Sequence, residues 1–192
     1  MELFKIPYLN PLRFHNETSG KFAFETIPAH EEQVLYVQKF HVSDFIAFQV
    51  LFVKTLIASA SYRIIRQDGT IIHEFTPAVS GSYGANYDVW GAKASDNIIS
   101  YLEEGQVYYL QMTINPVASV PMSYISDPFT LISNAENTIR LEYTHDANRF
   151  DVAFYPDAND LTNHPTFILR LEGGLQSDGY SPESKDVFYI DQ

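Results

Sequence analysis

The sequence contains no cysteine and few basic residues, and both absences limit its chemistry. Without cysteine the chain has no disulfide, no Cys-based zinc site, no iron–sulfur cluster and no thiol nucleophile. Only 12 Lys and Arg residues stand against 24 Asp and Glu residues, which gives a formal net charge of -12. The basic residues are scattered singly, so no basic patch offsets the repulsion of phosphate groups. We therefore expect no nucleic-acid partner.

Long apolar runs and a secretory leader are also missing. The longest apolar stretch, residues 45–53, contains Gln49 and is far too short to span a bilayer. The N-terminus has no charged start followed by an apolar run and a small-residue cleavage site. We expect a protein made in the cytoplasm without a signal peptide and without membrane insertion. A location outside the cell would then require a removed signal or release as part of a particle.

Aromatic and β-branched residues dominate what is present. The chain has 14 Phe, 13 Tyr and a single Trp among 192 residues. A chain of this length removes roughly 70% of its unfolded surface from water without a metal or disulfide. Apolar and polar residues alternate with a period of two over most apolar segments, which is typical of strands with one buried face. The sequence therefore predicts an all-β fold, with less than about a tenth of the residues in helix.

Two strand regions are predicted most clearly. Residues 62–75 contain two alternating runs around Asp68 and Gly69, which predicts a hairpin closed by a tight primed turn with positive φ angles. Residues 106–114 form a second strand directly after the turn at 103–105. Further strands are predicted at residues 137–145, 150–155 and 166–171. Two segments are ambiguous, since residues 29–40 fit a short helix or a strand and residues 94–102 fit one helical turn.

The strand pattern divides near residue 133, after a segment with two prolines and a short polar stretch. Residues 1–132 have the size and the regular strand spacing of an antiparallel β-sandwich. Residues 133–192 form a second, smaller β unit with room for about four strands, which is near the lower limit for independent stability. This unit either docks on the first or is the truncated beginning of a further domain.

Motifs for catalysis and for cofactor binding are absent from the sequence. No Gly-x-Ser-x-Gly elbow occurs, and neither phosphate-binding glycine motif is present. A pair of catalytic carboxylates requires only two acids about 5 to 10 Å apart, yet nothing points to a particular pair. We therefore expect a protein that is not an enzyme and that needs no cofactor.

Metal-binding patterns are weak. The six histidines form no His-x-His or His-x-x-x-His pair, so we expect them to lie on the surface or to pack. Two acidic segments resemble oxygen-rich calcium loops but lack the spaced glycine and the bidentate glutamate. Turns closed by Asx side chains explain them more simply. The weak metal candidates are Asp146, Asp151, Asp157 and Asp160.

The most suggestive segment for binding is residues 79–93. It combines three glycines with Tyr83, Tyr87 and Trp90, and it is predicted to be a loop. Aromatic faces on a loop suit stacking on sugar rings or anchoring a protein partner. The alternative is that Trp90 folds back and closes one end of the sandwich.

The C-terminal third resembles a known group of proteins. The resemblance lies in Phe167-Ile-Leu-Arg-Leu-Glu-Gly-Gly174, in Asp178-Gly-Tyr-Ser-Pro-Glu-Ser-Lys-Asp-Val187 and in Asp191-Gln192. Ser126-Asp-Pro-Phe129 and Asn137-Thr-Ile-Arg-Leu-Glu-Tyr143 are similar to the same pattern. Over residues 124–192 the chain thus resembles β-rich structural proteins of tails and virions in phages and prophages of gut Bacteroidetes. This resemblance implies a virion-associated role and a longer natural protein.

Two classes of function follow. The first is a structural or adhesion module of a phage-like assembly, with other structural proteins or a cell-surface receptor as partners. The second is a carbohydrate-binding module of a gut bacterial surface or secreted protein, with a glycan as ligand. The aromatic segment and the acidic charge favour the second class, while the resemblance and the missing catalytic motifs favour the first. The oligomeric state is not predictable from these features.

Overall fold

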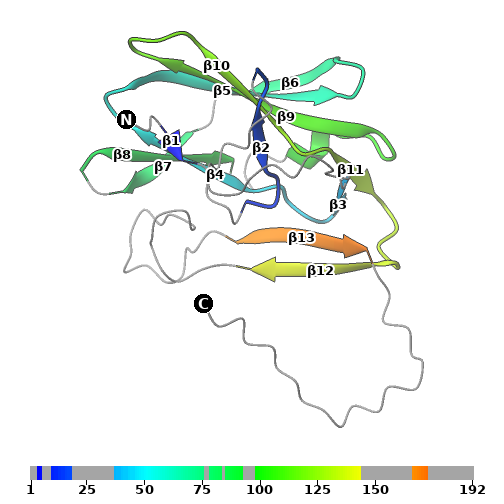
Figure 1. Ribbon diagram of the computed structural model, residues 1–192. Coiled ribbons are helices and arrows are strands. Elements are labelled where there is room, and N and C mark those ends of the chain that lie inside the picture. Colours follow the sequence, from blue (N-terminus) through cyan, green and yellow to red (C-terminus); the bar gives the residue numbers. More distant parts are fainter. Residues whose placement is uncertain are drawn as a thin grey trace.

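A computed structural model describes residues 4–5, 10–18, 37–75, 78–83, 85–92, 98–143 and 166–172 (Figure 1). The prediction of an all-β fold is confirmed. The helical structure in the described part of the chain is one 3-10 turn, η2 (Ile98–Tyr101). It lies within the segment 94–102 for which one helical turn is predicted.

The smaller of the two main sheets has four strands in the order β1-β4-β8-β7. All of its pairs are antiparallel. Strand β4 pairs with β1 and β8, and its residues from Phe48 to Phe52 are buried. The strands are β1 (Phe4–Lys5), β4 (Phe48–Val53), β7 (Ala78–Tyr83) and β8 (Tyr87–Ala92).

The larger sheet has seven strands and is centred on β9, which pairs with β5, β10 and β11. Most pairs are antiparallel, as expected. The pair β3–β11 is parallel, with Phe129 opposite Gln38, so the expectation of an entirely antiparallel sandwich needs this correction. Parallel partners are joined by long connections, and hydrophobic patterns do not reveal such pairings. The strands are β2 (Phe14–Asn16), β3 (Gln38–His41), β5 (Ile57–Arg66), β6 (Ile71–Phe75), β9 (Val107–Pro116), β10 (Met122–Ser126) and β11 (Phe129–Ile132).

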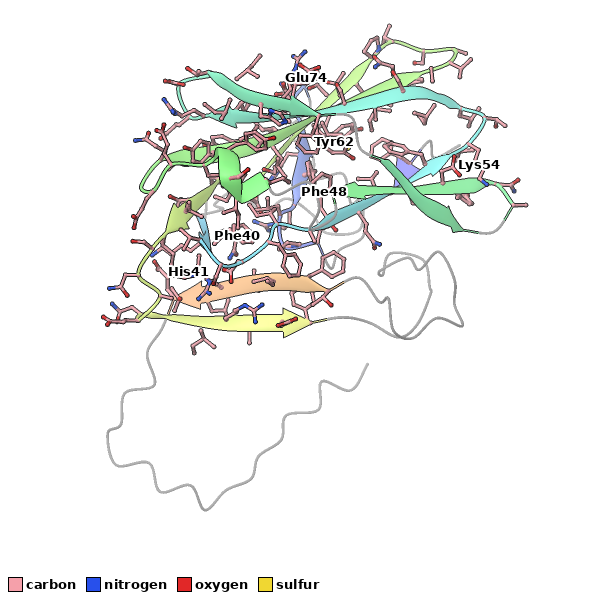
Figure 2. All side chains as sticks on the ribbon, turned by 180° about the vertical axis from the view of Figure 1, so that it is seen from behind. Phe40, His41, Phe48, Lys54, Tyr62 and Glu74 are labelled. Carbon is pink, nitrogen blue, oxygen red and sulfur yellow. The ribbon has the colours of Figure 1, made fainter. Side chains whose placement is uncertain are left out.

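The two sheets pack around one hydrophobic core. Side chains of β9 alternate between buried and half-buried positions, as a strand with one face on a core requires. The Phe48 ring of β4 lies 4.7 Å from the Tyr62 ring of β5, measured between centroids. The Phe4 ring of β1 similarly meets the Tyr124 ring of β10 at 5.0 Å. Figure 2 shows Phe48 and Tyr62 between the two layers.

The predicted hairpin is present as β5 and β6, but its turn differs from the prediction. The N–H of Gly69 donates to the carbonyl of Arg66 at 2.8 Å, and the N–H of Arg66 donates to the carbonyl of Thr70 at 2.8 Å. Gly69 has a φ of 87°. These bonds define a three-residue loop with glycine in the left-handed position, and not a two-residue primed turn. Glycine is required there because a side chain would be strained at this φ.

The second predicted strand is confirmed as β9, and Gly105 before it has a φ of 77°. The end of the ambiguous segment 29–40 is strand β3, whereas residues 29–36 lie outside the described residues. The predicted strand at 150–155 also lies outside them.

Strands β12 (Thr138–Tyr143) and β13 (Phe167–Glu172) form a separate two-stranded antiparallel sheet. This sheet follows β11, which ends at Ile132. It lies beside β3 in Figure 1, and the buried Gln38 side chain of β3 donates to the carbonyl of Arg170 at 3.0 Å. An isolated hairpin of this size is at best marginally stable, so this contact with the main sheets supports it.

Candidate functional site

The predicted aromatic loop is a β-hairpin. Tyr83 ends β7, and Tyr87 and Trp90 lie in β8, so the expectation of a loop at residues 79–93 is wrong for the described part of this segment. The register shifts between Val79 and Gly81, which marks a bulge. Glycine within a strand often marks such a bulge. Because glycine is also common in loops, the sequence of this segment predicts a loop instead of two strands.

The register of this hairpin separates the three aromatic residues. Tyr83 and Tyr87 are direct cross-strand partners beside the turn. Trp90 lies three positions further along β8, where its partners are Val79 of β7 and Val50 of β4. The hairpin therefore brings the two tyrosine positions together but sets position 90 apart, next to the fully buried Val50.

The most strongly built polar site lies elsewhere, at the turn after β3. The carboxylate of Asp44 is 0% exposed. It accepts hydrogen bonds from Nε and Nη2 of Arg170 in β13 at 2.5 and 2.9 Å, and from Nε of Arg140 in β12 at 3.2 Å. The backbone N–H of His41 adds a fourth bond at 2.7 Å. Burial alone raises the pKa of Asp44, but the bonds from Arg170 and His41 outweigh it and lower the pKa below its ordinary value.

A second carboxylate, Asp127, ties the N-terminal part of the chain to the connection between β10 and β11. It accepts from Nε of Arg13 at 2.6 Å and pairs with Nε2 of His15 at 2.8 Å. The N–H of Asp127 donates to the carbonyl of Arg13 at 2.8 Å. Burial alone raises the pKa of Asp127, and the bonds from His15 and Arg13 bring it below the ordinary value.

A third polar group surrounds His41. The N–H of Ser43 donates to Nδ1 of His41 at 3.2 Å, so Nδ1 is an acceptor and Nε2 carries the proton. Nε2 then donates to the carbonyl of Ser133 at 3.0 Å. Glu104 accepts from the hydroxyl and the N–H of Ser133 at 2.6 and 2.9 Å, and these two bonds lower the pKa of Glu104. These groups hold the segment that follows β11.

Sequence reasoning did not single out Asp44 or Asp127. Arg170 stands 126 residues from Asp44, and Arg13 stands 114 residues from Asp127. Neither spacing belongs to a local motif. Only the fold brings these partners together, so no sequence signal identifies them.

The histidines that the structure describes are in packing or hydrogen-bonding positions. His73 stacks on Tyr101 with ring centroids 3.8 Å apart, and His15 and His41 form the bonds described above. Within the described ranges, no group of three or more His, Asp or Glu residues is arranged to hold a metal ion. His30, His145 and His164 lie outside the described residues, as do Asp146, Asp151, Asp157 and Asp160.

In the part of the chain that the structure describes, no helix has the length and apolar character needed to cross a membrane. No protein-family model matches the chain, and neither a curated protein nor a solved structure matches it.

Proposed function

We propose that this chain is a non-catalytic structural or adhesion module of a phage-like tail or virion assembly. One observation carries the proposal: the polar groups best suited to chemistry join distant segments of the chain. Asp44 binds β12 and β13, Asp127 binds the segment around β2, and His41 binds the segment after β11. Such groups stabilise the β scaffold, and a scaffold of this kind acts through its surfaces.

Exposed apolar side chains support a role in assembly. Ile139, Leu141 and Leu171 are 40 to 41% exposed on the small sheet. Val117 and Val120, in the turn between β9 and β10, are 64 and 75% exposed. Exposed apolar side chains that gather in one region are typical of contacts between proteins. The resemblance of residues 124–192 to phage structural proteins supplies the kind of assembly.

The test is to look for the chain in particles. Particles released by lysis of cells that carry the gene are purified by density gradient, analysed by mass spectrometry and labelled with antibodies against the chain. We expect peptides of the chain in a fixed ratio to the major capsid protein, together with antibody label at a defined place on the particle. Absence of the chain from intact particles overturns the proposal.

A carbohydrate-binding module is the second candidate, and the pairing of Tyr83 with Tyr87 beside the β7–β8 turn favours it. Two tyrosines opposite each other at the tip of a hairpin suit stacking on a sugar. The test is a glycan array probed with the wild-type chain, Tyr87→Ala and, as a control away from the hairpin, Tyr101→Ala, which removes an exposed tyrosine. Binding that is lost only in Tyr87→Ala supports this function, and an array without any bound glycan removes it.

A further inference from the structure

The contact between the small β12–β13 sheet and the main sheets combines buried polar groups with a small apolar cluster. The apolar core shared by the two main sheets includes no residue of β12 or β13. Buried Phe167 of the small sheet packs against Tyr143 of the same sheet and against Ala47, which precedes β4, so a small apolar cluster separate from that core crosses the contact. The contact also contains hydrogen bonds and ion pairs, which include Gln38 with the carbonyl of Arg170 and Lys39 with Glu172. Contacts of this composition resemble those between separable domains.

Asp44 dominates this contact. It bonds to both strands of the small sheet, to Arg170 in β13 and to Arg140 in β12. Arg170 is itself almost fully buried and donates a further bond to Thr138 at 3.0 Å. Removing one member of such a buried pair leaves the other charge uncompensated, which costs far more than the loss of a surface pair.

We propose that the turn from His41 to Asp44 is a latch that holds the β12–β13 sheet against β3, and that this sheet is a movable unit of the chain. When the latch is closed, Phe167 and Ile168 are fully buried. When it opens, β12 and β13 leave β3, Arg170 gains water, and Phe167 and Ile168 become exposed. The main sheets keep their own core in both states.

Several charged groups face the latch, and they influence the equilibrium between its closed and open states. Arg140 also donates to Glu142 at 2.6 Å, so β12 loses only one of its ion pairs when Asp44 is removed. Lys39 and Glu172 form a second bridge between β3 and β13. His41 faces Ser43 and the carbonyl of Ser133, with Glu104 on the other side of Ser133. These flanking contacts are more exposed than Asp44, so among the polar contacts the buried pair contributes most to the attachment.

Hydrogen exchange followed by mass spectrometry tests the latch with Asp44→Asn, which keeps the size of the side chain and removes its charge. We expect the amides of β12 and β13 to exchange about a hundredfold faster or more, in line with the loss of a buried ion pair. We expect peptides from β5 and β9 to keep the wild-type rate. The matched control is Glu74→Gln, which removes the exposed pair with Arg63 in the β5–β6 hairpin and is expected to leave β12 and β13 unchanged.

A crosslink distinguishes undocking from misfolding of the small sheet. The chain has no native cysteine, so Lys39→Cys and Glu172→Cys provide unique thiols at a contact between β3 and β13. A short bismaleimide that joins them in the Asp44→Asn background is expected to restore slow exchange in β12 and β13. Three results overturn the proposal: unchanged exchange in Asp44→Asn, an equal increase in all peptides, or no recovery in the crosslinked protein.

Discussion

The hydroxyl group of Tyr62 is the clearest unfavourable feature in the core. The side chain is 0% exposed, and the oxygen has no hydrogen-bond partner among the residues that the structure describes. The ring itself is well packed, since it lies against Phe48 and stacks on Phe75 with centroids 5.6 Å apart. We therefore predict that Tyr62→Phe, which removes only the oxygen, raises the free energy of unfolding.

The expected gain follows from two opposing contributions. A buried hydroxyl without a partner costs about 1 to 3 kcal/mol relative to its hydrated state. Deleting the oxygen leaves a space of roughly 12 Å³, which costs roughly 0.3 kcal/mol at about 24 cal/mol per Å³. The net expectation is a gain of about 1 kcal/mol, which corresponds to an increase in Tm of about 2 to 4 °C for a chain of this size.

Tyr108 provides the matched control, because it is equally buried in the same core but has hydrogen bonds. Its hydroxyl accepts from the N–H of Glu103 at 2.8 Å and lies 3.4 Å from the carbonyl of the same residue. Tyr108→Phe is therefore expected to lose about 1 to 2 kcal/mol. Urea denaturation followed by circular dichroism measures both variants. A loss of stability in Tyr62→Phe equal to that in Tyr108→Phe would refute the reasoning.

Three further predictions concern titration and the aromatic hairpin. Burial raises the pKa of Tyr62 and Tyr143, so only the unfolded chain releases these protons near pH 10. The free energy of unfolding should therefore fall as the pH rises above about 10, and it should fall less steeply in Tyr62→Phe. Urea titrations at pH 8 and 11 would measure both effects. The pKa of Asp127 is lowered in the folded chain, so the contribution of its ion pairs to the free energy of unfolding is present above about pH 4 and is lost as the pH falls below that value. In the same assay, Asp127→Asn should lose about 2 kcal/mol of stability at pH 7, and its stability should depend less on acid pH. Trp90 is the only tryptophan and is paired in register with buried Val50, so its emission should be blue-shifted and weakly quenched by acrylamide, whereas emission typical of water would favour a binding role.

The elements that sequence reasoning predicted well are those with local causes. The hairpin of β5 and β6 and strand β9 each combine alternating apolar residues with a glycine turn signal. The exact turn was not predictable, because Asp68 and Gly69 fit both a two-residue loop and a three-residue loop. The difference depends on the pairing register of the strands, which shifts between Ile64 and Ile65.

The features that were missed depend on contacts between distant segments. The parallel pairing of β3 with β11 joins residues about ninety positions apart, and neither strand carries a mark of its partner. The sequence of the β7–β8 hairpin predicts a loop because glycine is common in loops, although Gly81 lies at a bulge within a strand. Asp44 is one of 24 acids in the sequence, and only its burial beside Arg170 distinguishes it.

The pairing of charges also bears on the kind of partner that the proposed structural role would require. Every Lys and Arg side chain that the structure describes lies in an ion pair with an acid of the same chain. In the described part of the protein the uncompensated charge is therefore acidic, and a polyanion would have to displace internal pairs in order to bind. If the chain has the structural role proposed above, a neighbouring protein would have to bring its own cations or dock on an uncharged surface. The apolar positions on β12–β13 and in the β9–β10 turn are such surfaces, and shape and apolar contact on them are better suited than charge to decide which partner binds.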